Sequence, residues 1–151
     1  MSTAFVAPEE LLSRFILQSN HIRKANNTVK PDAFIPHPRE ELSVTRHLNL
    51  DQQALWSIGD DVAQRREKHL YGRAVNQASA YMDHKLKVLP VPVAGNPNHA
   101  NVIGWPEKES QKIIALEIAA KSEFIPRQDN ILGEGMCFPF SIREKVPRRG
   151  G

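Results

Sequence analysis

Residues 95–106 read GNPNHANVIGWP, and this stretch organises the second half of the chain. Asn96 to Asn98 form a turn signal, because a proline flanked by asparagines favours a tight reversal. The residues that follow alternate between apolar and polar and predict a strand over 99–103. Pro106 then suits the first turn of a helix, where its missing N–H costs nothing. A polar turn, a buried strand and a helix in this order often place functional side chains near the turn.

Two helices are predicted around this stretch. From Glu107 to about Ser122 the apolar residues recur at helical spacing with charged residues between them. An earlier helix is expected to begin after Asp51, a good N-cap residue, and to run to about Glu67. Within this earlier helix, Gly59 is expected to allow a close approach to the sheet.

Three further segments have the character of strands. Residues 42–46 alternate apolar and polar side chains with β-branched residues among them. Residues 72–75 favour a strand, although 74–82 also fit helical spacing. Pro90 and Pro92 alternate in one apolar run, which allows hydrogen bonding on one side only and predicts an edge strand or an extended connection.

The first 41 residues are less regular. Residues 11–17 fit either a helix or a strand. Residues 30–41 hold three prolines, so no helix is expected there. The latter segment is predicted to be an extended loop with Phe34 and Ile35 against the core.

Together these elements predict an α+β fold. A small mixed or antiparallel sheet is expected to carry the two main helices, both on one face. The chain has 151 residues, enough for one domain with a real core. We assign this domain to residues 1–126 and a C-terminal extension to residues 127–151.

Composition restricts the partners and the compartment. The net charge is +3, but residues 51–124 carry nine acidic and nine basic side chains, so nucleic acid is an unlikely partner. Cys137 is the single cysteine, and no secretory signal or run of ~18 apolar residues is seen. The sequence therefore predicts a cytoplasmic protein with no disulfide and no membrane span.

The familiar catalytic templates are absent. No phosphate-binding glycine loop, nucleophile elbow or paired-histidine helix motif occurs, so neither a metal nor a cofactor is predicted. Arg46 is in phase with the apolar face of its strand, so it must find a partner or reach solvent.

One set of polar residues on the predicted strands suggests an anion site. It contains Ser43, Arg46, Arg73, His99 and Asn101. If the strands are neighbours, the arginines could hold a phosphate-bearing or nucleotide-like substrate while His99 transfers a proton. This is the hypothesis of a small enzyme. The alternative is that each side chain satisfies local backbone groups.

The leading functional hypothesis is a non-enzymatic adaptor that acts through protein contacts. It is motivated by the missing templates and by aromatic residues that could dock on a protein partner. Those residues are Trp56, Trp105, Phe138 and Phe140.

The chain ends in two glycines, Gly150 and Gly151, after two arginines. This end resembles the tail of ubiquitin-like modifiers, whose terminal carboxylate is adenylated and transferred. Only glycine lacks a Cβ that would obstruct passage through a narrow activating site. The preceding domain does not have the pattern of the compact β-grasp fold of those modifiers, so conjugation is an alternative function.

Three segments carry a wider resemblance: KPDAFIP at 30–36, LSVTR at 42–46 and NPNHANV at 96–102. They are similar to a group of small bacterial proteins without an established activity, over about residues 12–122. The resemblance implies a bacterial cytosolic source and transfers no catalytic residue.

Overall fold

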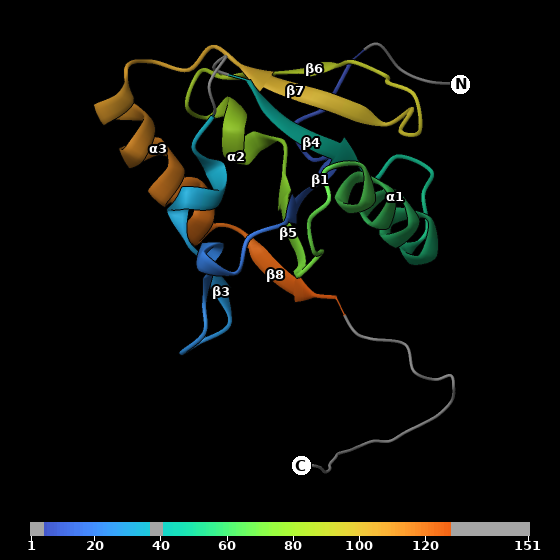
Figure 1. The fold of residues 1–151 in the computed structure, drawn as a ribbon. Helices are drawn as coiled ribbons and strands as arrows, with labels where there is room; N and C mark the ends of the chain where they lie inside the picture. Colours follow the sequence, from blue (N-terminus) through green and yellow to red (C-terminus); the bar gives the residue numbers. More distant parts are fainter. Residues whose placement is uncertain (1–4, 37–40, 128–151) are drawn as a thin grey trace.

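The computed structural model describes residues 5–36 and 41–127 and has an α+β fold, as predicted (Figure 1). The strands of its main sheet are β1 (Leu11–Ile16), β4 (Leu42–Arg46), β5 (Gly72–Gln77), β6 (Lys87–Pro90), β7 (His99–Ile103) and β8 (Glu123–Pro126). The helices are α1 (Gln52–Arg65), α2 (Ser79–Met82) and α3 (Lys108–Ala120). The smaller elements are β2 (Ile22–Arg23), β3 (Thr28–Val29) and the 3-10 turns η1 (Ser19–His21) and η2 (Pro31–Phe34).

The main sheet has six strands in the order β6-β7-β4-β1-β5-β8, and every neighbouring pair is antiparallel. The segment that fitted either a helix or a strand is β1, in the middle of this sheet. All six of its residues pair with β5, from Leu11 opposite Gln77 to Ile16 opposite Gly72. Pairing with two neighbouring strands, which local spacing cannot reveal, therefore decides its conformation.

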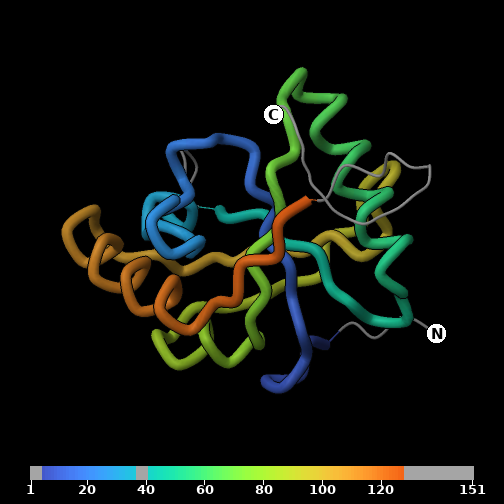
Figure 2. Tube along the Cα trace, turned by 90° about the horizontal axis from the view of Figure 1, so that it is seen from below, coloured from blue at the N-terminus to red at the C-terminus, as the bar shows by residue number. Residues whose placement is uncertain are grey.

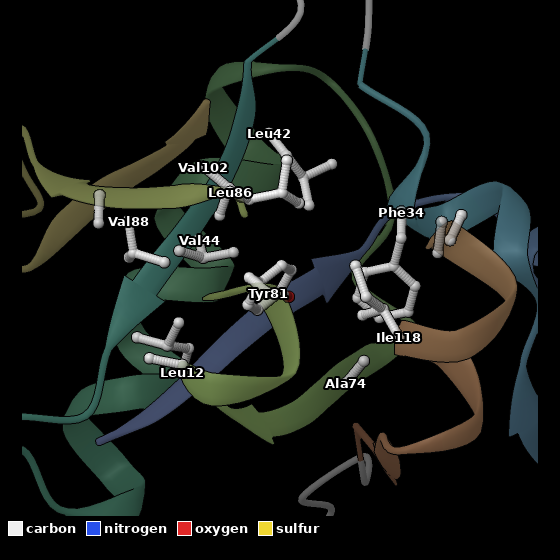
Figure 3. Close-up of a cluster of buried hydrophobic side chains, with 14 of the residues drawn as sticks. Leu12, Phe34, Leu42, Val44, Ala74, Tyr81, Leu86, Val88, Val102 and Ile118 are labelled. Atoms are coloured by element: carbon white, nitrogen blue, oxygen red, sulfur yellow. The ribbon is translucent and has the colours of Figure 1, made fainter. Parts of the chain in front are cut away.

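One face of the sheet carries the main hydrophobic core (Figure 3). Helix α3, helix α2 and the η2 turn cover this face and contribute fully buried side chains. The largest of these side chains are Phe34, Tyr81 and Ile118, which lie over Leu12 and Ala74 of the central strands. Burial of this surface is the main stabilising term of the fold.

Helix α1 lies on the opposite face, so the prediction of both helices on one face was wrong (Figures 1 and 2). Side chains alternate between the faces of a strand. Leu12 belongs to the core under α3, whereas Ser13 and Arg73 face α1 and connect to its residue Gln52. The main core cluster of the described residues contains no side chain from α1.

Gly59 brings α1 close to the sheet, as its position in the helix predicted. A Cβ at this residue would lie 2.7 Å from the Phe15 ring and 3.1 Å from Leu70. The helix therefore rests on the ring of Phe15, which comes from β1.

Replacing Gly59 with alanine is expected to lower the free energy of unfolding by about 1 kcal/mol. Alanine is favoured over glycine inside a helix by a similar amount, but the crowding against Phe15 outweighs this gain. Ser57→Ala, at an exposed position of the same helix, is the matched control and should be neutral or slightly stabilising. Urea unfolding of both variants measures the difference, and a more stable G59A protein would contradict the close contact.

Strand β6 is an edge strand, as the two prolines predicted. The Val91 N–H donates to the His99 carbonyl of the inner neighbour at 2.8 Å. Pro90 and Pro92 have no N–H to offer on the outer side, which discourages pairing with another chain.

Two segments differ from the prediction. The proline-rich segment contains the single turn η2, because Pro31 occupies its first position, where a missing N–H is tolerated. Its Phe34 is fully buried, as expected. Strand β8 was not predicted and adds the second edge of the sheet. The division of the chain at residue 126 stays a prediction, because residues 128–151 lie outside the described part.

Candidate functional site

A cavity of about 430 Å³ lies between α1, the central strands and the β6–β7 hairpin. Its walls come from four parts of the chain that are distant in sequence: β1 with the residues after it, β4, the second half of α1, and the hairpin. The charged and polar residues around it include Arg14, His21, Ser43, Asp61, Arg65, Arg66 and His99.

The cavity exists because two central strands separate. β1 and β4 pair only at Leu12–Arg46 and Ser13–Thr45. Beyond these pairs the side chain of Arg14, from β1, reaches toward β4 and the η2 turn. Its Nε donates to the Ala33 carbonyl at 2.9 Å and its Nη1 to the Ser43 carbonyl at 3.0 Å. Arg14 thus satisfies a carbonyl group that the interrupted ladder leaves free.

The electrostatics of Arg14 are unusual for an arginine. Burial lowers its pKa to about 10, the Tyr81 hydroxyl opposes this shift, and the charge of Arg66 adds to it. Among the described residues, the hydrogen bonds of Arg14 go to carbonyl oxygens and none to a carboxylate. The guanidinium is half-buried, yet some of its N–H groups have no acceptor among the residues that the structure describes.

The hairpin closes one side of the cavity by touching α1. Arg65 and Asp61 form an ion pair at 2.8 Å, one turn apart on the helix. A Cβ on Gly95 would lie 2.8 Å from Arg65 Nη2 and 2.9 Å from Asp61 Oδ2, and its φ is +82°. Glycine is required here by both the close approach and the left-handed backbone.

Three asparagine contacts fix the hairpin. Asn96 Nδ2 donates to Thr45 Oγ1 at 2.9 Å. Asn98 Nδ2 donates to the carbonyls of Arg46 and Leu48 at 3.0 and 2.8 Å. The turn predicted at Asn96 to Asn98 is confirmed, and its side chains attach the hairpin to the end of β4.

Two histidines line the cavity. His99 Nδ1 lies 2.9 Å from the Val91 carbonyl and donates to it, so Nε2 keeps its lone pair in the neutral ring. Burial, followed by the charge of Arg14, lowers the pKa of His21. His21 is therefore mainly neutral at pH 7.

The five residues predicted to form an anion site lie in different places. Ser43 and His99 both line the cavity. Arg46 instead pairs with Glu10, with 3.0 Å between Nη2 and Oε1, so it has found the partner that its position required. Asn101 lies opposite Ser43 in the β4–β7 register but does not line the cavity.

Arg73 belongs to a buried polar network under α1. Its Nη1 donates to Ser13 Oγ at 2.9 Å and its Nη2 donates to Gln52 Oε1. Ser13 Oγ in turn lies 2.7 Å from His47 Nε2. The guanidinium is fully buried and lies 4.9 Å from the centre of the Trp56 ring. Arg46 and Arg73 thus bond to other side chains and do not line the cavity, whereas His99 does. The catalytic role of His99 stays a prediction.

Two of the predicted docking residues, Trp56 and Trp105, are described by the structure, and both make contacts within the protein. Trp105 is 6% exposed and its Nε1 donates to the Val102 carbonyl at 2.9 Å, so it is a core residue and not an exposed anchor. The centre of the Trp56 ring lies 4.9 Å from the guanidinium carbon of Arg73 and 5.1 Å from that of Arg127. Phe138, Phe140, Gly150 and Gly151 lie outside the described residues. The adaptor and conjugation hypotheses stay predictions.

The sequence reasoning missed Arg14 and Arg66. Arg66 stands in a cluster of basic residues that has the composition of a solvated helix end. Arg14 carried a detectable signal, because it is in phase with Leu12 and Ile16 on the apolar side of its strand. The same signal had identified Arg46.

Comparison with known proteins gives no family model, no curated protein and no solved structure that matches this chain. Within the described ranges, no three His, Cys, Asp or Glu side chains are grouped so that they could hold a metal ion. No helix in the same ranges is long and apolar enough to cross a bilayer.

Proposed function

We propose that the protein binds a small organic anion in the cavity between α1 and the separated strands β1 and β4. The observation that carries the proposal is Arg14, a half-buried guanidinium in the cavity wall with Arg66 nearby. Neither has a carboxylate partner among the described residues. Burying a cation without a counter-ion is costly, and two cations beside one cavity repel each other. A bound anion removes both penalties.

Calorimetric titration with a panel of anions tests the proposal. The panel contains inorganic phosphate, benzoate and phenyl phosphate. We expect at least one of them to bind, and Arg14→Gln and Arg66→Gln each to weaken that binding by about tenfold or more, the loss of one charge-assisted contact. Arg23→Gln, an exposed arginine outside the cavity, is the control and should bind as the parent protein does.

The two cavity variants separate binding from folding. R14Q also removes hydrogen bonds to two carbonyl groups, so it is expected to be less stable. R66Q changes an exposed rim residue and should unfold like the parent protein. Failure of every anion to bind, or equal binding by R66Q and R23Q, would overturn the proposal.

A further inference from the structure

The walls of the cavity beyond the arginines are apolar. Phe15 and Leu17 line it from the β1 side, Val44 from β4 and Val62 from α1. The volume of about 430 Å³ falls within the range of roughly 300–1,000 Å³ typical of small-molecule sites. An inorganic ion would leave these apolar walls in contact with water. The cavity therefore suits a ligand with an apolar body as well as a charged group.

The charge of the cavity points to a doubly charged head group. Arg65 is already neutralised by Asp61 in the ion pair at 2.8 Å. Arg14 and Arg66 remain, with no carboxylate partner in the described part of the chain. Two cations acting on one small cavity are balanced by two negative charges on a single group. A phosphate monoester carries about two charges above pH ~6 and accepts several N–H donors at once.

Two polar residues on the sheet side could complete the head-group contacts. Ser43 and His99 line the cavity from the neighbouring strands β4 and β7, on the same face of the sheet. His99 is held in place by its bond to the Val91 carbonyl, and its Nε2 has no hydrogen-bond partner within the described ranges and can face a ligand. A hydroxyl and an imidazole can each share a hydrogen bond with a phosphate oxygen.

We infer that the cavity takes a small organic phosphate monoester, with its phosphate between Arg14 and Arg66 and its apolar body against Phe15 and Val62. The inference rests on the proposed function and names the chemical class of its ligand. Placing the apolar body against Val62 adds buried apolar area that neither inorganic phosphate nor a polar phosphate ester can supply.

Titration of the full chain with three matched anions tests this inference. Phenyl phosphate is expected to bind about tenfold more tightly than inorganic phosphate, which lacks the ring, and than benzoate, which lacks the second charge. Val62→Thr, which exchanges a methyl group for a hydroxyl, should reduce the preference for phenyl phosphate over inorganic phosphate by about threefold or more. Val75→Thr, at a half-buried strand position outside the cavity lining, is the matched control and should leave this preference unchanged.

Each other outcome has a distinct meaning. Equal affinity for inorganic and phenyl phosphate, with loss of both in R66Q, would overturn the inference and leave the proposed function standing. Equal affinity for benzoate and phenyl phosphate would likewise overturn the assignment of a doubly charged head group. Absence of binding by all three anions would overturn the proposed function as well.

Discussion

Replacing Gly72 with alanine is expected to lower the free energy of unfolding by about 3 kcal/mol. Gly72 begins β5 and pairs with both neighbouring strands, opposite Ile16 on one side and Pro126 on the other. A Cβ at this position would lie 2.5 Å from the Ile125 carbonyl oxygen and 2.7 Å from the Phe124 ring. The nearest atom belongs to the backbone, so β8 itself has to shift.

Gly104→Ala is the control for this experiment. Gly104 has a φ of +93° but open space around it, since the nearest atom to a Cβ would be 3.7 Å away. The free energy of unfolding of its alanine variant should therefore fall by only about 1 kcal/mol, the cost of a left-handed backbone for a residue with a Cβ. Urea unfolding compares the two, and a G72A protein no less stable than G104A would show that β8 adapts without cost. Adding Phe124→Ala to G72A should not restore stability, because the carbonyl contact remains.

The sequence predicted those elements whose signals are local. β4 and β7 have the predicted bounds, and the N-cap of α1 is confirmed by the Asp51 carboxylate, which accepts from the Ala54 N–H at 2.8 Å. The edge position of β6 also followed from local chemistry, because proline lacks an N–H wherever the strand lies.

What the sequence did not predict depends on contacts between distant segments. β1 has a strand conformation because two other strands pair with it, and no spacing within residues 11–17 records that. Helix α1 covers the face of the sheet that carries Ser13 and Arg73, and these two residues meet only when β1 and β5 are adjacent. Strand β8 was missed for the same reason, since its pairing partner is about 50 residues earlier.

The candidate site was harder to predict than the fold. Ser43 and His99 were chosen because they lie on predicted strands, and both line the cavity. Arg46 was chosen for its position in an apolar stripe, yet it forms an ion pair with Glu10. Arg14 had the same pattern, and only the separation of β1 from β4 places it beside a cavity. A charged residue in an apolar stripe thus indicates a required partner, but which partner depends on the fold.

Stability is expected to fall in mild acid because of His47. Its Nε2 accepts a hydrogen bond from the Ser13 hydroxyl at 2.7 Å, and Arg73 Nη1, which donates to that hydroxyl, lies 3.4 Å from the same nitrogen. Burial, followed by the charge of Arg73, lowers the pKa of His47 to about 4, and Glu10 opposes the shift. A protonated ring would lose its acceptor and face a cation.

The direction of the pH dependence follows from the lowered pKa. The unfolded chain takes up a proton on His47 near its ordinary pKa of about 6.5, whereas the folded protein does so only near 4. Between these values the unfolded state binds more protons, so the free energy of unfolding falls as the pH is lowered from about 6.5 to about 4. The full shift corresponds to about 3 kcal/mol, and solvent screening of the half-buried ring reduces the expected loss to about 2 kcal/mol.

Urea unfolding of the parent protein and His47→Gln across this pH range measures the effect. The variant keeps a polar side chain but cannot titrate, so its stability should change less between pH values of about 6.5 and 4, while the carboxylates contribute equally to both proteins. The His47 ring proton signals in NMR give the pKa directly. In Arg73→Met the removal of the nearby cation should raise the pKa of His47, which shifts the loss of stability toward neutral pH. A His47 ring that titrates near 6.5 in the parent protein would contradict this account, because a neutral acceptor beside Arg73 cannot have an ordinary pKa.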